Sequence, residues 1–275
     1  LVRSMTHALD TLPHTGALRY KDEINRIPAA AISTVDATTL SHALENHPDL
    51  EVSLQMNCAA FDDVLQGNVI GQWTGTEKPN EIITIGGHLD SWDIGEGAHD
   101  DGAGVVHTLE ALRILKAIDY QPKRTLRFVL FINEENGNRG GKEYARKAAI
   151  ENKESDLVHV GAMESDAGGF VPRGFRIDAT DSATAIVRSW EGLFDPYNIH
   201  LFRRGGAGVD ISPLKTLNPR PTMLGLSPDG QRYFDFHHSS QDVFENVHKR
   251  ELELGAATFA AALAMLDQHL PSPQP

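Results

Sequence analysis

The stretch EIITIGG at residues 81–87 is short, rich in isoleucine and closed by two glycines. Such a run, with no polar alternation beyond its first residue, is typical of a strand buried on both faces of a parallel sheet. A second run of this kind, TLRFVLFI, occupies residues 125–132. Between them, residues 101–118 place Val105 and Leu109 on the apolar stripe of a helix. This order predicts two parallel strands joined by a crossover helix.

The same alternation continues on both sides of this unit. Further strands are expected at residues 68–75, 157–163, 176–179 and 222–225, and further helices at residues 141–149, 182–194 and 250–270. The predicted fold class is therefore α/β, with a mainly parallel mixed sheet sandwiched by helices. In such sheets, ligands bind beyond the carboxyl ends of the strands.

Composition removes several classes of protein. The 275 residues carry 25 Lys and Arg against 38 Asp and Glu, a formal charge of −13, which argues against binding of a nucleic-acid backbone. No apolar run approaches the ~20 residues of a membrane span. The single cysteine, Cys58, excludes an internal disulfide framework and is expected to be a buried apolar residue.

Acidic and histidine residues follow the predicted strands at the rim where a ligand is expected. They are His88 and Asp90, the pair Asp100-Asp101, the pair Glu134-Glu135, Asp166, and the pair His237-His238. Singly, each has an ordinary explanation: a loop histidine paired with a carboxylate, a helix cap, or a solvated strand end. Together they fit two metal ions about 3.5–4 Å apart, which need a bridging carboxylate, further ligands and a non-ligand carboxylate as base.

Five stretches resemble the co-catalytic zinc exopeptidases of the aminopeptidase and glutamate carboxypeptidase type, whose fold is phosphorylase/hydrolase-like. They are GGHLDSWDIGEGAHDDGAG (86–104), PKRTLRFVLFINEE (122–135), MESDAG (163–168), GVDIS (208–212) and FHHSSQDV (236–243). The resemblance extends from Leu1 to about Leu266. It implies two Zn²⁺ ions and a water held between them.

The resemblance also implies a role for each residue. His88 and Asp166 would bind one zinc, Glu135 and His238 the other, Asp100 would bridge both, Asp90 would orient His88, and Glu134 would be the general base. His238 is preferred to His237 because it directly precedes the small Ser239 and stands four residues before Asp242. His237 would either donate to the oxyanion, which is favoured, or be a packed neighbour.

The first part of the chain resembles a different unit. Residues 1–57, through PHTGALRY (13–20) and IPAAAISTVDA (27–37), resemble the C-terminal part of a protease-associated insert domain. Asp36 is expected to cap a helix that ends near Asn46, and residues 51–57 to form a half-buried strand. Residues 58–275 would be the di-zinc catalytic domain, with the N-terminal part of the family's chain absent.

The expected function is hydrolysis of short peptides or dipeptides by a zinc-dependent exopeptidase, with Glu134 as base. Aminopeptidase, carboxypeptidase and dipeptidase activity stay open. The alternatives are a metal-free binding or receptor domain and a single-zinc enzyme of the glutaminyl cyclase type. Arg203 and Arg204 could bind a substrate carboxylate but are more simply a solvated pair, and the glycines of residues 205–208 are expected to shape a pocket wall. The resemblance implies a periplasmic or secreted protein and leaves a homodimer open.

Overall fold

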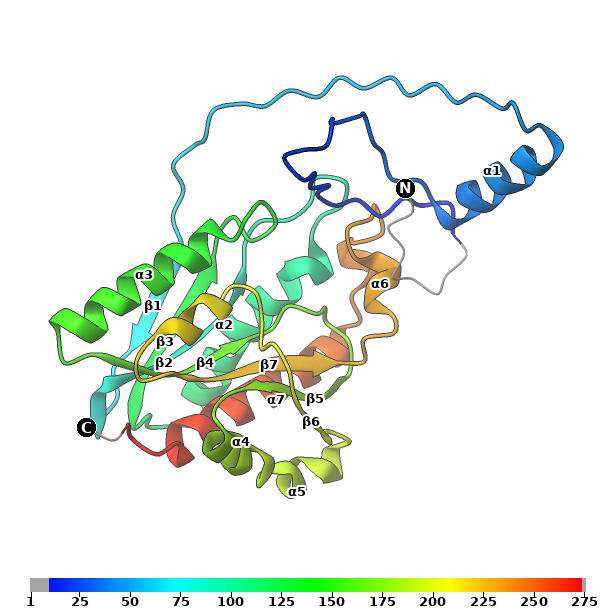
Figure 1. Cartoon of the computed structure of the whole chain (residues 1–275). Helices are drawn as coiled ribbons and strands as arrows, with labels where there is room; N and C mark the ends of the chain where they lie inside the picture. The colour runs from blue at the N-terminus through cyan, green and yellow to red at the C-terminus, as the bar shows by residue number, and fades with distance from the viewer. Residues whose placement is uncertain (1–9, 274–275) are drawn as a thin grey trace.

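A computed structural model describes residues 10–273 of the chain (Figure 1). The first nine residues of the predicted 1–57 domain and the last two of the predicted 58–275 domain lie outside the described residues. Within residues 10–273, no helix is both long and apolar enough to cross a membrane. Residues 10–67 are called the arm below, and residues 68–273 the sheet body.

The sheet body alternates strands and helices as the sequence predicts. The strands are β1 (Val69–Trp73), β2 (Lys78–His88), β3 (Arg124–Phe131), β4 (Val158–Glu164), β5 (Pro172–Asp178), β6 (Leu201–Arg204) and β7 (Thr222–Pro228). The α-helices of this part are α2 (Ala103–Ala117), α3 (Arg139–Glu154), α4 (Asp181–Arg188), α5 (Glu191–Phe194), α6 (Tyr233–Phe236) and α7 (Lys249–His269). Short irregular helices are η1 (Ala98–Gly102), η2 (Asp195–Tyr197), η3 (Ser212–Thr216) and η4 (Phe244–Asn246).

The strands form one mixed sheet in the order β1-β3-β2-β4-β7-β5-β6. The central pairs β3–β2, β2–β4 and β4–β7 are parallel, as is β5–β6 at one edge. The pairs β1–β3 and β5–β7 are antiparallel. The predicted mainly parallel mixed sheet is thus confirmed, whereas β6 and the antiparallel direction of β5 were not predicted.

Helices cover both faces of this sheet, so its central strands are buried on both sides. Leu126 and Phe128 of β3 belong to the apolar cluster that includes residues of α2 and α7. Val129 and Phe131 of the same strand belong to a second cluster, formed with α3 and η3. Because successive strand residues point to opposite faces, a strand that packs on both faces must be apolar almost throughout. This is why β3 is apolar from Leu126 to Phe131 except at Arg127.

One predicted helix is divided in the structure. The segment predicted as a helix over residues 182–194 forms α4 and then the short α5. Ser189 ends α4, and its hydroxyl donates to the carbonyl of Ile186 at 2.6 Å. A serine side chain that bonds a carbonyl of its own last turn competes with continuation of the helix.

The arm differs from the sequence prediction at three points. Helix α1 (Thr34–Asn46) is capped by Ser33, whose hydroxyl accepts from the amide of Asp36 at 3.0 Å. The prediction of Asp36 as the cap is wrong, because Asp36 lies in the first turn and supplies the donor. The predicted strand at residues 51–57 is also wrong: these residues are exposed and have no partner strand within residues 10–273. Cys58, expected to be buried, is exposed.

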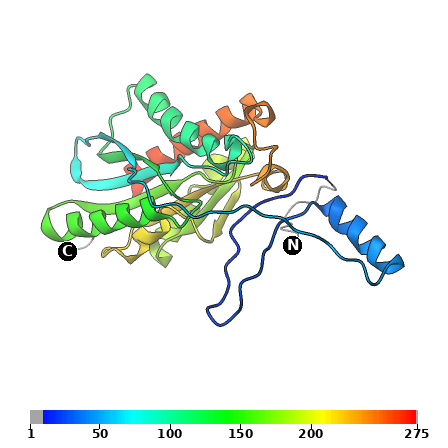
Figure 2. The same ribbon diagram turned by 90° about the horizontal axis from the view of Figure 1, so that it is seen from above.

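Figures 1 and 2 show the arm passing beside one end of the sheet, with α1 projecting away from it. Within α1, all of which the structure describes, no residue is buried. A segment with alternating or periodic apolar residues is therefore not buried unless another part of the protein packs against it. The division of the chain at residue 57 stays a prediction.

Candidate metal and catalytic site

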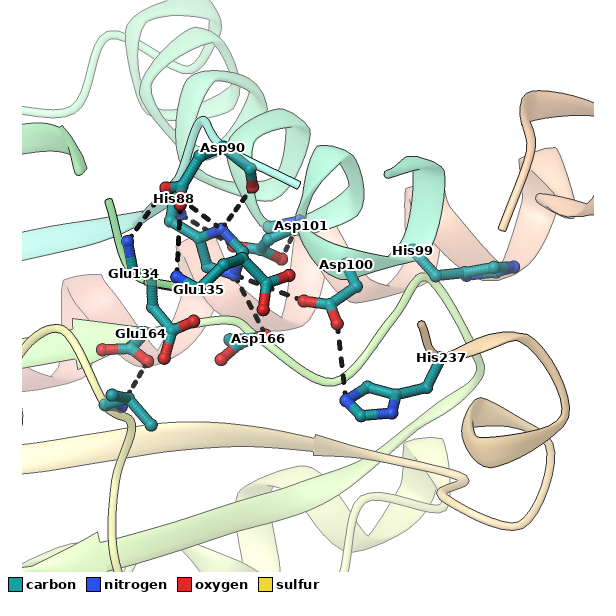
Figure 3. Close-up of polar contacts among 12 residues, drawn as sticks. His88, Asp90, His99, Asp100, Asp101, Glu134, Glu135, Glu164, Asp166 and His237 are labelled. Carbon is teal, nitrogen blue, oxygen red and sulfur yellow. Dashed lines mark hydrogen bonds and ion pairs between the residues drawn. The ribbon is translucent and has the colours of Figure 1, made fainter. Parts of the chain in front are cut away.

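The candidate residues meet where the three central parallel strands end (Figure 3). His88 is the last residue of β2, Glu134 and Glu135 follow β3, and Asp166 follows β4. Parallel strands in neighbouring positions bring these ends together, as the strand order predicts. Asp100 comes from η1, and His237 and His238 follow α6. The structure thus brings together all eight residues to which the resemblance gives a role.

Asp100 lies between two histidines from distant parts of the chain. Its Oδ1 is 3.3 Å from Nε2 of His88, and its Oδ2 is 3.1 Å from Nε2 of His238. Asp166 Oδ1 lies 3.6 Å from the same His88 nitrogen, and Glu135 Oε2 lies 3.2 Å from the His238 nitrogen. Each oxygen of one carboxylate therefore faces a separate pair of a histidine and an acid.

The donor atoms fit divalent cations. Nε2 of His88, although it faces Asp100 and Asp166, and Oε1 of Glu135 are buried without a well-aligned hydrogen bond among residues 10–273. Buried polar atoms normally have partners, so atoms that converge without one indicate an absent electrophile. Imidazole nitrogen and carboxylate oxygen are both common zinc ligands. The electrostatics agree, since a cation offsets the repulsion among the clustered carboxylates.

The clustered carboxylates also change the pKa values of the two histidines that they face. Burial by itself lowers the pKa of His238, but the carboxylates of Asp100 and Glu135 outweigh it and raise the value to about 9. For His88, burial is likewise outweighed by Asp100 and Asp166, so that its pKa lies well above its usual range. In the absence of metal, protons on the histidines compensate the acids. Metal binding must therefore release protons.

Glu134 stands apart from the carboxylates that approach the histidines. Burial, followed by the nearby Asp166 carboxylate, raises the pKa of Glu134 to about 7. A carboxylate with a pKa near neutrality can both accept and return a proton. Its backbone amide donates to Oδ1 of Asp90 at 3.0 Å, and the amide of Glu135 donates to Oδ2 of Asp90 at 3.2 Å.

Asp90 therefore contacts two elements of the site. Its carboxylate fixes the turn that carries Glu134 and Glu135. Its backbone carbonyl lies 2.8 Å from Nδ1 of His88, whereas its carboxylate Oδ1 lies 3.8 Å from that nitrogen. A carbonyl at Nδ1 holds the tautomer whose lone pair is on Nε2, the nitrogen that faces Asp100. Asp90 is placed to orient His88 mainly through its backbone.

His237 and His238 have different surroundings although their rings stack at 3.7 Å. Nε2 of His237 lies 3.5 Å from Oδ2 of Asp100, while His238 contacts both Asp100 and Glu135. The arm holds this turn: Thr15 donates its amide to the His238 carbonyl at 2.8 Å. Nδ1 of His14 lies 2.6 Å from the His237 carbonyl. His238 has a φ of 55°, an uncommon conformation that these contacts help to fix.

The sequence allowed two explanations for the doublet Asp100-Asp101, a helix cap and a metal ligand. In the structure each residue fits one of them. Asp101 is buried, and its carboxylate accepts from the amides of His88 and Gly104, each at 3.0 Å. Asp101 thus supports the start of α2 while Asp100 faces the histidines. A side chain at Gly87 or Gly104 would collide with the Asp101 carboxylate. The glycines that flank the motif therefore make room for this buried acid.

Sequence inspection missed further supporting acids. Asp242 accepts from the amides of His99 at 2.6 Å and Asp100 at 3.1 Å, so it fixes the backbone of the shared carboxylate. Glu164 accepts from the amides of Val209 and Ile211 and lies close to Asp210. Their spacing along the chain gives no sign of these contacts. The available signal is that Asp242, Glu164 and Asp210 lie in the stretches FHHSSQDV, MESDAG and GVDIS, which the resemblance had marked without giving these acids a role.

A cavity of about 540 Å³ opens onto the site. Its lining includes Asp100, Glu134, Glu135, Asp166 and His237. A second cavity of about 170 Å³ shares Asp166 and Tyr233 with it and is walled by Gly206, Ala207 and Gly208. The glycine-rich segment therefore does shape a pocket wall.

Arg203 and Arg204 are exposed, and neither is among the residues that line these two cavities. Arg204 pairs instead with Asp181. The explanation of these two arginines as a solvated pair is therefore correct.

Known proteins resemble both the sequence and the fold. Carboxypeptidase Q of Bos taurus is 34% identical over 274 residues, which is 98% of this chain and 57% of the relative. The chain thus spans little more than half the length of this curated relative. The crystal structure of a peptidase M28 precursor from Shewanella amazonensis has a TM-score of 0.87 and 33% identity, and the match covers 99% of this chain and 61% of that one.

More distant structures share the fold. A zinc aminopeptidase from Bacillus subtilis has a TM-score of 0.56 at 20% identity, with 71% of this chain and 49% of that chain covered. The sequence profile of peptidase family M28 matches residues 68–263. This range contains the whole sheet and all the candidate residues of the site. With a matching profile over most of its length and a relative 34% identical over 98% of its residues, the chain belongs to peptidase family M28.

Proposed function

We propose that this chain is the catalytic part of a zinc-dependent exopeptidase that holds two Zn²⁺ ions and hydrolyses short peptides or dipeptides. The observation that carries the proposal is the division of the Asp100 carboxylate between His88 and His238, each with its own second acid. One ion would be held by His88 and Asp166, the other by His238 and Glu135, and Asp100 would contact both. Names of relatives such as carboxypeptidase Q agree with peptide hydrolysis.

Bound zinc would supply Lewis acidity, which lowers the pKa of a water and polarises the scissile carbonyl. Glu134 accepts a proton from the attacking water and later donates it to the leaving amine as the carbon–nitrogen bond breaks. The water oxygen stays on the new carboxyl group, so one water is consumed per bond. His237, whose Nε2 faces Asp100, donates to the oxyanion as it forms. Asp90 holds the turn of Glu134 and the tautomer of His88.

The decisive variant is Glu134→Gln in the metal-loaded chain. It removes the proton acceptor but keeps the size of the side chain, so kcat/KM for a dipeptide should fall by about 10²–10⁴-fold while two zincs per chain remain bound. Glu154→Gln, at an exposed end of α3, is the matched control and should change neither. Normal turnover by the zinc-loaded Glu134→Gln protein would show that Glu134 is not the base.

Metal content and substrate choice separate this proposal from its alternatives. About two zincs per chain and hydrolysis abolished by a chelator support it. Absence of bound metal together with absence of turnover would favour a binding domain of the same fold. One zinc with cyclisation of N-terminal glutamine would favour a glutaminyl cyclase. The periplasmic or secreted location and the homodimer stay predictions.

A further inference from the structure

The site cavity has an uneven distribution of charge. Four carboxylates line it: Asp100, Glu134, Glu135 and Asp166. Two cations line it as well, Arg19 from the arm and Lys142 from the first turn of α3. If two dications bind as proposed, the four carboxylates are balanced. Arg19 and Lys142 then remain as the uncompensated charges of the cavity, so the loaded cavity favours an anionic group on its ligand.

Arg19 has no competing partner among residues 10–273: its side chain forms neither an ion pair nor a hydrogen bond there. Many other arginines of the chain pair with acids, for example Arg124 with Glu81 and Arg139 with Asp63. A guanidinium can bind a carboxylate through two parallel N–H donors, and an uncommitted one loses no existing interaction by doing so.

The backbone near Arg19 is tied to the metal site. Four residues earlier, Thr15 exchanges hydrogen bonds with His238: its amide donates to the His238 carbonyl at 2.8 Å, and its carbonyl lies 3.1 Å from the ring Nδ1. Ala17, between them, also lines the cavity. The segment that carries Arg19 is therefore fixed to the turn that carries a candidate ligand, and Arg19, an exposed residue, lines the same cavity as Asp100 and Glu134.

Lys142 reaches the cavity from a different element. Its Nζ donates to the carbonyl of Gly137 at 2.7 Å, which holds the ammonium close to the loop after Glu134 and Glu135. This contact is to a neutral carbonyl, so the charge of Lys142 is not balanced by it. Two N–H donors of the ammonium remain for a ligand.

We propose that Arg19, assisted by Lys142, binds the free α-carboxylate of a short peptide whose scissile carbonyl lies at the metal centre. The site then releases the C-terminal residue, either from a dipeptide or from a slightly longer peptide. This inference rests on the proposed function. It also gives the arm the carboxylate-binding role considered for Arg203 and Arg204, which are not among the residues that line this cavity.

The test compares three substrates on the zinc-loaded protein: alanyl-leucine, alanyl-leucinamide and alanine p-nitroanilide. Arg19→Ala should lower kcat/KM for alanyl-leucine by about 10–100-fold, the scale of a lost charge-assisted hydrogen bond. It should leave the amide and the anilide within about 2-fold, because neither carries the carboxylate. Lys142→Ala should show a smaller loss with the same selectivity, and Arg19→Lys should restore part of the activity.

Arg26→Ala is the matched control, because Arg26 is an exposed arginine of the same arm outside the cavity. Equal losses on all three substrates would mean that Arg19 only supports the site, and no loss on alanyl-leucine would also overturn the proposal. Calorimetric titration with N-acetyl-leucine and its amide gives a readout without turnover. Binding of the acid should weaken about 10-fold or more in Arg19→Ala. If the wild type hydrolyses nothing, the proposed function fails, and this titration still decides the role of Arg19.

Discussion

The arm and the sheet body contribute in opposite ways to the same site. The body buries its central strands between helices on both faces, and side chains such as Ile83 and Leu224 are fully enclosed. In the arm, α1 buries none of its residues, and residues 51–67 are all exposed. Yet His14 of the arm is buried against the His237–His238 turn. A segment that buries few of its own residues can thus still contact the candidate site.

The largest expected effect tests where stability resides. Leu224→Ala in β7 removes a side chain that is 0% exposed, and we expect the free energy of unfolding to fall by about 2–5 kcal/mol. Leu44→Ala in α1, where the leucine is 43% exposed, should change it by less than about 0.5 kcal/mol. Urea denaturation of both variants measures the difference. A large loss for Leu44→Ala would mean that α1 packs against a surface and that the contrast is wrong.

The second expected effect concerns a buried acid that destabilises the sheet body. Asp210 is 0% exposed, and its two carboxylate oxygens have no hydrogen-bond partner among residues 10–273. Burial raises its pKa to about 8. An unfolded Asp titrates near ~3.9, so between about pH 4 and 8 the folded state holds a proton that the unfolded state has released. Stability therefore falls as pH rises through this range.

Asp210→Asn removes that titration. In chelator-treated protein, the variant should be more stable than the wild type by about 1–3 kcal/mol at pH 8. The difference should shrink toward pH 4. Thermal melts at several pH values measure it, with Asp49→Asn at an exposed position as the control. A difference independent of pH would show that Asp210 is ionised in the folded protein.

The third prediction separates the arm's contact from its fold. Thr15→Pro deletes the amide that donates to the His238 carbonyl. Loss of support for a ligand commonly weakens metal binding about 10–100-fold, and we expect this for zinc measured by chelator competition. Thr15→Val keeps the amide and loses the 3.3 Å hydroxyl contact to the same carbonyl, so it should bind zinc almost normally. Unchanged affinity in the proline variant would remove the arm from the site.

The smallest effect lies within the arm itself. Ser33→Ala removes the cap of α1 and should reduce the stability of that helix by about 1 kcal/mol. Because α1 is not part of the core, hydrogen exchange of its amides should accelerate while the unfolding midpoint of the body stays the same. Asp36→Ala should have the smaller effect, since the Asp36 side chain is not the cap. A shift of the body's midpoint would show that the two regions unfold together.

Sequence patterns predicted the body far better than the arm, for a physical reason. Strands such as β2 and β3 carry apolar residues on both faces because helices cover both faces of the sheet. Their composition alone therefore indicates that they are buried. The run at residues 51–57 alternates as a half-buried strand does, yet all its residues are exposed and no strand among residues 10–273 pairs with it. Periodicity reports what a segment could bury, and only the rest of the chain decides whether it does.

The candidate site was predictable to a similar extent. Strand order brings His88, Glu134 and Asp166 to one rim, so their proximity followed from the strand assignments. The roles of Asp101 and Asp242 depend on hydrogen bonds to particular amides, which no spacing reveals. The contact of His14 with His237 spans 223 positions along the chain. Arg19 was missed for this reason, since only the fold carries the arm to the cavity.

The exposed course of residues 51–67 has a consequence for the integrity of the candidate site. A protease that cut this segment would leave the sheet body whole but break the covalent link between it and the part of the arm before the cut. Among residues 10–273, contacts of His14 and Thr15 would still join that part to the His237–His238 turn. In the intact chain the connection keeps the arm near the site at an effective concentration on the order of millimolar. After the cut, the fraction of molecules with the arm bound would fall as the protein is diluted. The segment therefore makes binding of the arm independent of the protein concentration.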